Sequence, residues 1–474
     1  MNYRFLLILL AYGFAGKTYA QDYSAIHGSS YFGSLGVYNN PSSILGTPYK
    51  WDLTLTGLQY QTITNAVRGP NFPLILSPSG NFYAANGNYK RDVDAGFNVR
   101  FLNFRYSLNN RHAFAFGLNF RGYVNGNTST INYTDSVIGP RTFLSLNTEN
   151  GNISANAATS TWMELYGTYA ITVKDDAVST LNAGASLKIM KGMAGGFGKV
   201  NNVGVERVTT PGEPTVYKIL AGDATYGYSD NLGDFENVSA GDFLSGAGTG
   251  FAFDVGVEYV IKSQAVANFY DEMPLTDYDW KIGVSLLDLG WNNYAYSNQS
   301  RSISTLKPEI SSTTLTEKFA SVRSIDTFND SLATIVENSE TLTGKFSISN
   351  PARAVVNVDR YLSGNFYVNG ELSINLSSGK GDKAAVAGSK LLTVTPRWEK
   401  RTLGFYLPVQ YNRHGNFWIG GAVKAGPLLF GTHNLLNIFS KNKYIGGGAY
   451  LAIIIRPMNF IRDARLKQYE CPEM

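Results

Sequence analysis

Few residues in this chain of 474 have the types and spacing that catalysis or metal binding requires. The four histidines, His27, His112, His414 and His433, are far apart, and none belongs to a metal-ligand spacing such as His-Glu-x-x-His. A Ser-His-Asp site is assembled in space, so the sequence alone does not exclude it, but no Gly-x-Ser-x-Gly elbow is present. His112 and His414 flank expected turns, where solvated loop residues are the simpler interpretation. We therefore predict no catalytic residue, no metal site and no enzyme activity.

Two glycine-rich stretches superficially resemble phosphate-binding loops. Residues 379–383 (Gly-Lys-Gly-Asp-Lys) lack the Walker spacing and a following helix, and residues 195–198 (Gly-Gly-Phe-Gly) lack the βαβ context of a dinucleotide site. The lone Cys471 argues against a disulfide framework and against thiolate metal clusters. The net charge of +4 is small and spread out, which gives no argument for nucleic acid. We expect neither a cofactor nor a nucleic-acid partner.

The chemistry that remains is a set of ionisable side chains on the polar face of predicted strands. These candidates are Arg100, Arg105, Arg121, Glu164, Lys188, Asp254, Glu258, Lys281 and Glu371. On a lipid-exposed face each Arg or Lys would cost about 2–4 kcal/mol at mid-membrane, so we expect them to point into the lumen of a barrel. Two interpretations are open: a mutual ion-pair network that fills and stiffens the barrel, or a polar conduit. The mixture of both signs favours the network.

Long alternating strands must position these side chains, and residues 93–124 show the pattern best. Apolar, mostly aromatic residues alternate with small or polar ones on both sides of a polar break at residues 109–111, which predicts a β-hairpin. The alternation shifts by one residue at Phe101–Leu102, as at a β-bulge. An aromatic outside with a small, polar inside is typical of a transmembrane barrel wall. If the bulge is misplaced, Arg100 and Arg105 cannot both point inward.

Similar strands recur along the chain and are too long for an ordinary soluble sheet. About thirteen can be counted, and because bacterial single-chain barrels close with an even number, about fourteen are expected, with twelve or sixteen as alternatives. The predicted fold class is all-β: an antiparallel transmembrane β-barrel with an N-terminal plug-like segment and short helices in one long excursion. Residues 125–160 and 292–350 are expected to be mostly loop, and residues 192–249 to be irregular with weak strand signals near 200–208 and 216–228. Aromatic residues near strand ends could form the interfacial girdles: Trp51, Trp162, Tyr259, Trp280, Trp418 and Tyr444.

The expected organisation has four parts. Residues 1–20 have the positive, apolar and small-residue regions of a signal peptide. Residues 21–50 are expected to be a plug or hatch, with a plain linker as the alternative. Residues 51–460 are the barrel, within which 292–350 is the excursion with helix-like spacing. Residues 461–474 are a charged tail.

Several motifs in a fixed order resemble a known family. They are Asn40-Pro41-Ser42, 188–192, 253–259, 283–290, 395–398, 406–409 and 426–428. In this order they resemble an uncharacterised family of exported outer-membrane β-barrels of Gram-negative bacteria, a domain of unknown function. That family is distantly similar to long-chain fatty-acid transporter barrels and to the type IX secretion shuttle barrel. The transporters carry Asn-Pro-Ala in an N-terminal hatch, so the resemblance implies a hatch role for Asn40, Pro41 and Ser42.

The sequence thus predicts a cell outer-membrane protein with outer-membrane lipid around it. The leading function is passive passage of a small hydrophobic or amphipathic solute. The alternative is a scaffold or adaptor that binds a secretion or envelope protein through its long loops.

Overall fold

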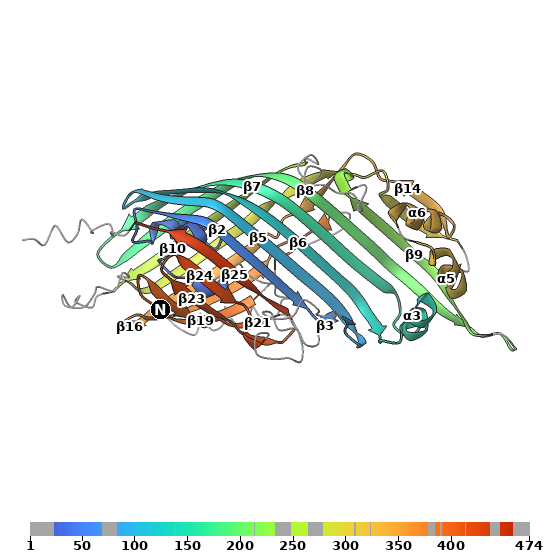
Figure 1. The fold of residues 1–474 in the computed structure, drawn as a ribbon. Helices are drawn as coiled ribbons and strands as arrows, with labels where there is room; N and C mark the ends of the chain where they lie inside the picture. The colour runs from blue at the N-terminus through green and yellow to red at the C-terminus, as the bar shows by residue number, and fades with distance from the viewer. Residues whose placement is uncertain are drawn as a thin grey trace, which may run out of the picture.

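Fourteen strands close into an antiparallel barrel in the computed structural model of the protein (Figure 1). The structure describes residues 23–68, 83–137, 139–212, 214–232, 248–263, 278–307, 310–322, 324–377, 384–388, 391–412, 414–436 and 446–457. Strand β2 (Trp51–Thr64) pairs with β5 (Gly87–Asn109) on one edge and with β25 (Gly446–Ile455) on the other, which closes the ring. The predicted barrel and its strand number are confirmed.

The other wall strands follow in chain order around the ring. They are β6 (His112–Tyr133), β7 (Ile153–Asp175), β8 (Ser179–Val208), β10 (Gly248–Lys262), β11 (Tyr278–Ala295), β16 (Arg353–Ser363), β17 (Phe366–Asn375), β19 (Leu391–Glu399), β20 (Leu403–Tyr406) with β21 (Val409–Asn412), β22 (Phe417–Ile419) with β23 (Gly421–Ala425), and β24 (Leu428–Thr432). Two crossings are interrupted, one at Pro408 and one at Gly420. Proline has no N–H for the strand ladder, which explains the first break.

Side chains alternate between an apolar outer face and a buried inner face, as a membrane barrel requires. Phe116, Leu165 and Phe253 are 55%, 56% and 50% exposed. The residues beside two of them in the chain, Glu164 and Asp254, are fully buried inside. Lipid therefore faces the apolar set, and the lumen holds the ionisable set.

The predicted bulge in β5 is present. The pairing of β5 with β6 shifts register between Phe101 and Phe104, and Leu102 has a φ of 50°, in the left-handed region. The shift restores the inward phase after the break. Arg100 and Arg105 are accordingly both buried, at 2% and 0% exposure.

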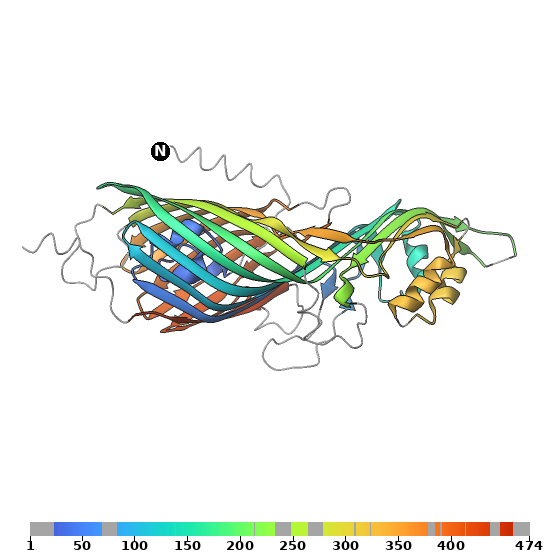
Figure 2. The same ribbon diagram turned by 90° about the horizontal axis from the view of Figure 1, so that it is seen from above.

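Several strands continue beyond the ring as a curved sheet (Figure 2). The long ends of β5–β8 are joined there by β9 (Val216–Tyr228), β12 (Arg301–Leu306), β13 (Ile310–Ser311) and β14 (Val336–Thr341). The helices α3 (Pro140–Asn147), α5 (Ser312–Phe319) and α6 (Ile325–Ala333) lie beside it. Burial under these helices raises the pKa of Tyr226 to about 12. We call this part the extension.

The remaining described elements are short. They are the 3-10 helices η1 (Ser24–Ile26), η2 (Pro41–Leu45) and η3 (Asp230–Leu232), the helix α2 (Gly33–Gly36), and the strands β3 (Val67–Arg68), β4 (Tyr83–Ala84), β15 (Lys345–Ser349) and β18 (Ala384–Ala385). None of the helices in the described part of the chain is long and apolar enough to span a membrane.

Two sequence predictions about loops are wrong, and a third is confirmed in part. Residues 125–160 contain the end of β6, helix α3 and the start of β7, and residues 292–350 contain four strands besides two helices, where one or two helices were expected. In residues 192–249 the weak strand signals near 200–208 and 216–228 are confirmed as the end of β8 and as β9, but β8 also covers 192–199. In the extension both sheet faces are polar or only partly covered, as in the Val336–Thr341 strand, so the apolar alternation that reveals a wall strand is missing.

The prediction of an aromatic girdle is wrong for two tryptophans. Trp162 and Trp418 are 0% and 2% exposed and lie inside the barrel. Trp162 stacks on Tyr123, with ring centroids 5.5 Å apart, and donates to Glu164 at 2.9 Å. A position near a strand end does not reveal which face a side chain occupies. Of the other predicted girdle residues, three are exposed or half-buried on the outer face of the wall: Trp51, Tyr259 and Trp280.

Some expectations fall outside the described residues. These are the signal peptide (1–20), the tail (461–474), the glycine-rich stretch 379–383 and Tyr444. The other glycine-rich stretch, 195–198, is part of strand β8.

The membrane-facing role of the outer wall can be tested with two matched leucines. Leu165 on β7 is 56% exposed on the barrel, and Leu220 on β9 is 61% exposed on the extension. We expect Leu165→Arg to lower the free energy of unfolding by about 2–4 kcal/mol, because the charge would enter the hydrocarbon region. Leu220→Arg should change it little. Urea unfolding in lipid vesicles measures both, and equal effects would contradict the assignment of the outer face.

Candidate functional site

Residues 23–50 run through the inside of the barrel, and we call them the lumen segment (Figure 2). Its short helices η1, α2 and η2 are nearly fully buried. Phe32 packs edge-on against the inward-facing Tyr406, with ring centroids 6.2 Å apart, and Tyr23 lies 5.3 Å from Tyr450. The lumen is therefore occupied, on this side, by a piece of chain that belongs to no strand.

Cations of the wall bind the backbone of the lumen segment. The backbone N–H groups of the wall strands are already hydrogen-bonded within the sheet. The carbonyls of a non-sheet segment inside the barrel therefore need side-chain donors. The bonds are Arg100 to Leu35 O (3.3 Å), Arg105 to Ile44 O (2.7 Å) and to Tyr49 O, Lys281 to Gly28 O (2.7 Å), Arg353 to Tyr38 O (2.8 Å) and Arg397 to Gly28 O (3.4 Å). Charged donors make stronger bonds than neutral ones, so they hold the segment firmly.

Carboxylates of the wall accept the complementary donors. The pairs are Ser34 N to Asp52 (2.7 Å), Tyr38 OH to Glu164 (3.0 Å), Asn39 Nδ2 to Glu371 (3.0 Å), Ser29 Oγ to Glu399 (2.8 Å), and His27 Nδ1 with Glu371 (2.9 Å). Donors and acceptors are thus matched along the length of the lumen segment. We call the charged wall side chains that surround and bind the lumen segment the cradle.

Asn40-Pro41-Ser42 sits on a floor of glycines. Asn40 caps η2 by accepting from the Ser42 backbone N–H at 3.0 Å, and its Nδ2 donates to Val257 O at 3.0 Å. A Cβ on Gly184 would lie 2.6 Å from Ser42 N, and one on Gly256 would lie 2.1 Å from Asn40 Oδ1. Only glycine allows the motif to approach the wall this closely. The geometry gives these residues a docking role, while a hatch role stays a prediction.

A buried ion network spans the wall beside this motif. Asp288 accepts from Arg121 at 2.7 and 2.9 Å and from Lys188 at 2.6 Å, and Arg353 approaches it at 3.4 Å. Lys188 also pairs with Asp254 at 2.7 Å. Together with Glu164, which lies 3.3 Å from Arg121, the network sets three carboxylates against three cations. Its charges balance, as burial requires.

Tyr38 joins the lumen segment to this network. Its ring lies 4.3 Å from the guanidinium of Arg100 and 5.1 Å from Nζ of Lys188, in cation–π geometry. It also packs edge-on against Tyr166, with ring centroids 5.2 Å apart. Its hydroxyl donates to Glu164 and its backbone carbonyl accepts from Arg353, so Tyr38 anchors the segment to the network.

A second network lies further round the ring. Arg397 forms a bidentate pair with Asp359 and donates from Nε to Glu399 at 2.9 Å. Glu399 also accepts from Tyr406 OH at 2.8 Å, and Nζ of Lys424 lies 3.7 Å from the ring of Tyr31. These residues surround the first part of the lumen segment with fixed charges.

The structure buries all nine candidates from the sequence, with exposures of 5% or less. It brings Arg121, Glu164, Lys188 and Asp254 into one network. Arg100, Arg105, Lys281 and Glu371 contact the lumen segment instead, and Glu258 faces Gly46, where an added Cβ would lie 3.5 Å from its Oε1. The two interpretations from sequence both omitted a third role, the binding of the chain's own N-terminal part.

Sequence reasoning missed several members of the cradle. They are Asp52, Asp288, Arg353, Asp359, Arg397, Glu399 and Lys424. The alternation within the strands carried a signal for Asp359 and Arg397, which lie opposite the apolar residues of their strands. Asp288 had none. It has a φ of 57° beside a register shift, and that bulge turns it inward together with its neighbour Leu287.

No group of three or more His, Cys, Asp or Glu residues in the described ranges is arranged to hold a metal ion.

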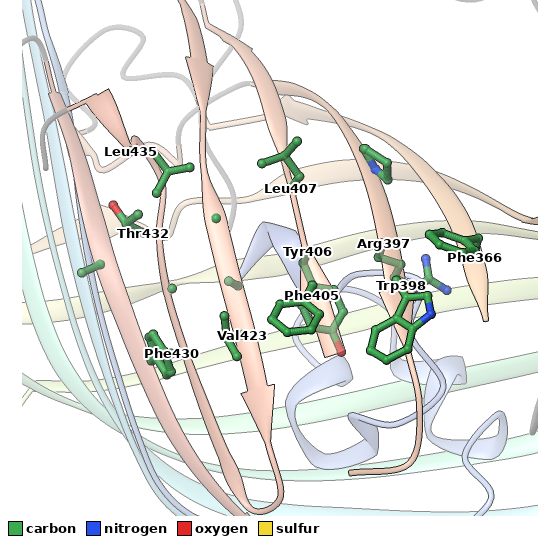
Figure 3. A pocket seen from close by; sticks show the side chains of 15 residues that line it. Phe366, Arg397, Trp398, Phe405, Tyr406, Leu407, Val423, Phe430, Thr432 and Leu435 are labelled. Carbon is green, nitrogen blue, oxygen red and sulfur yellow. The ribbon is translucent and has the colours of Figure 1, made fainter. Parts of the chain in front are cut away.

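An apolar groove of about 630 Å³ lies where the wall is interrupted (Figure 3). Outward-facing Phe366, Trp398, Phe405, Val423 and Phe430 line it. It follows the strands that break at Pro408 and Gly420, where the ladder has fewer bonds to hold the wall closed. The groove can take an apolar molecule of modest size.

The profile of a family of unknown function (DUF5723) matches residues 50–433. The chain belongs to this family. The match begins at the start of β2 and ends just after β24, so in this DUF5723 protein it covers most of the wall and leaves the lumen segment ahead of it. The predicted membership of an uncharacterised barrel family is confirmed. A search of the curated proteins finds no match.

Solved structures similar to this DUF5723 protein are membrane barrels of low sequence identity. The Ralstonia pickettii toluene transporter TbuX is 12% identical, with a TM-score of 0.37, and the match covers 89% of this chain and 93% of that one. The Pseudomonas putida toluene transporter TodX is 7% identical, with a TM-score of 0.32 and coverages of 93% and 97%. A Pseudomonas aeruginosa FadL homologue is 8% identical, with a TM-score of 0.25 and coverages of 93% and 99%.

The glycine floor can be tested with two alanine substitutions. We expect Gly256→Ala to displace η2 and to weaken protection of residues 33–45 against amide hydrogen exchange by about 1–3 kcal/mol, because the new methyl overlaps Asn40. Gly167→Ala is the control, since a Cβ there meets nothing within 4 Å. Mass-spectrometric exchange in vesicles measures both. Unchanged protection in Gly256→Ala would contradict the docking of the motif on the wall.

The Asp288 network makes a stability prediction. Asp288→Asn leaves three buried cations short of a carboxylate, so we expect the free energy of unfolding to fall by about 3–5 kcal/mol. Asp176→Asn removes an exposed pair with Lys174 (2.8 Å) and should have little effect. Urea unfolding in lipid vesicles measures both variants. A small effect of Asp288→Asn would show that the network is not holding the wall together.

Proposed function

We propose that this DUF5723 protein is an outer-membrane barrel that passes small hydrophobic or amphipathic solutes. The observation that carries the proposal is the apolar groove of about 630 Å³ at the interrupted strands. A solute that dissolves in the membrane can enter such a groove without leaving an apolar environment. The inner faces of the same strands line the lumen.

The proposal assigns the lumen segment the role of a plug. Fixed charges bind its backbone along its length, so the barrel is closed to ions while it is in place. Its contacts are side-chain bonds that can be exchanged one at a time, whereas removal of a wall strand would open the whole sheet. The segment is thus the part of the structure that can move without loss of the barrel.

The groove can be filled to test passage. Val423→Trp places a large side chain in the groove, and Val284→Trp places the same side chain on the outer face of β11, away from it. We expect cells that carry Val423→Trp in their outer membrane to take up an apolar naphthylamine dye about tenfold more slowly than wild type, because the entry volume is lost. Val284→Trp should match wild type. Equal uptake by the two variants would contradict entry through the groove.

A recording in planar bilayers tests the plug separately. The protein without residues 23–50 should conduct ions, and the full chain should conduct little. If neither conducts, the barrel is not a channel.

The extension favours a second candidate, an adaptor for an envelope or secretion protein. It stands outside the ring with its own small core of Ile303, Ile310, Ile335 and Val336. A surface that the barrel does not need for closure is available for a protein partner. Crosslinking from cysteines placed on β14 in cells would capture such a partner. Normal dye uptake after removal of the extension would separate this role from transport.

A further inference from the structure

The inner wall carries a patch of a different character from the charged cradle. It lies on β17, β19 and β21, and its side chains are polar but uncharged. We call it the neutral strip, and its members are Ser373, Thr393, Thr395 and Asn412. All are at least nine-tenths buried. Strand register places Asn412 opposite Leu391 and Thr393 opposite Glu371, so the members on β17, β19 and β21 are neighbours.

Each side chain of the neutral strip has a buried polar atom without a hydrogen-bond partner among the described residues. These atoms are Ser373 Oγ, Thr393 Oγ1, Thr395 Oγ1 and Asn412 Nδ2. Buried polar atoms in folded proteins are nearly always bonded, because leaving them unbonded destabilises the fold. Several together on one patch of wall indicate that the protein holds them ready for something that is not part of the chain.

Two charged wall residues flank the strip, Glu371 opposite Thr393 and Arg397 two residues from Thr395, and both already have partners. Arg397 pairs with Asp359 and Glu399. Glu371 already accepts from His27, Asn39 and Asn357, the last at 2.8 Å. The neutral strip therefore offers hydrogen bonds without a free counter-charge. A buried ion would lose its hydration there and gain no opposite charge, whereas a hydroxyl or amide would find both donors and acceptors.

The neutral strip and the apolar groove share a section of wall. Thr395 points inward, and the next residue, Pro396, lines the groove outside. Both lie beside the break at Pro408, where Leu407 N donates to Pro396 O at 3.1 Å. An apolar volume on one side and unbonded polar atoms on the other suit the two parts of one amphipathic molecule.

We propose that the neutral strip binds the head of an uncharged amphipathic solute, such as an alcohol or an amide, and that it discriminates against charged heads. This inference rests on the proposed transport function only in treating the bound molecule as a solute that the barrel passes. Binding itself depends only on the strip. Hydroxyl groups suit it best, because a hydroxyl can donate to Thr393 Oγ1 or Thr395 Oγ1 and accept from Asn412 Nδ2 on the neighbouring strand.

The test compares three six-carbon probes with different heads: 1-hexanol, hexanoate and hexylammonium. Isothermal titration of the full protein in lipid nanodiscs, with empty nanodiscs as the reference for partitioning, gives the three dissociation constants. We expect 1-hexanol to bind about tenfold or more tightly than either ion, because a dry site with no counter-charge rejects both. If hexanoate or hexylammonium binds as tightly as 1-hexanol, the proposal is wrong.

A pair of variants locates the site. Thr393→Val with Thr395→Val removes two unbonded hydroxyls at constant shape, so the barrel should stay folded and 1-hexanol should bind about tenfold more weakly. Thr168→Val is the matched control, since its buried hydroxyl already bonds Ser186 at 2.7 Å elsewhere on the inner wall. Unchanged 1-hexanol binding in the double variant would overturn the proposal.

The same variants separate this inference from the transport function. Tight 1-hexanol binding together with dye uptake that Val423→Trp leaves unchanged would keep the binding site and reject entry through the groove. If dye uptake depends on Val423 but the three probes bind equally well, entry through the groove is supported and the neutral strip is rejected as a binding site.

Discussion

The bonds from wall cations to carbonyls of residues 28–49 are the interaction on which the inside of this barrel depends. A barrel of fourteen strands is too wide for its own side chains to fill, unlike one of about eight. The lumen segment fills part of that space, but its backbone belongs to no sheet. Arg100, Arg105, Lys281, Arg353 and Arg397 supply the donors that its carbonyls need. Without them, a non-sheet chain could not be buried there.

This constraint divides the inner wall by chemistry. Cations that hold the lumen segment need carboxylates of their own. Asp288 provides one for Arg353, Asp359 for Arg397 and Asp52 for Arg105. Where the segment docks through backbone contact, glycines replace side chains and let η2 approach. The neutral strip lies outside this scheme, because its atoms bond neither the segment nor the charged networks. That difference is the reason to assign it a ligand and not a structural role.

The alternation of residues predicted which side chains point into the lumen better than it predicted what those side chains bind. Arg121, Glu164 and Lys188 were found because each alternates with apolar neighbours, and the shift at Phe101–Leu102 correctly kept both Arg100 and Arg105 inside. Asp288 was missed because a bulge in its own strand reverses its direction. The lumen segment was also missed as the partner of these charges, since contacts between residues 56 to 126 positions apart leave no mark in the local pattern.

The sequence by itself determined the fold class and the two faces of the wall, and it indicated about fourteen strands without fixing the number. These follow from periodicity two and from the cost of placing charge in lipid, which act on every strand separately. Only the tertiary structure decided what the inward charges bind, that Trp162 and Trp418 lie inside, and that the wall breaks beside an apolar groove. Those features depend on which strands become neighbours when the ring closes. Closure brings β2 against β25 and surrounds the lumen segment with side chains from all parts of the chain.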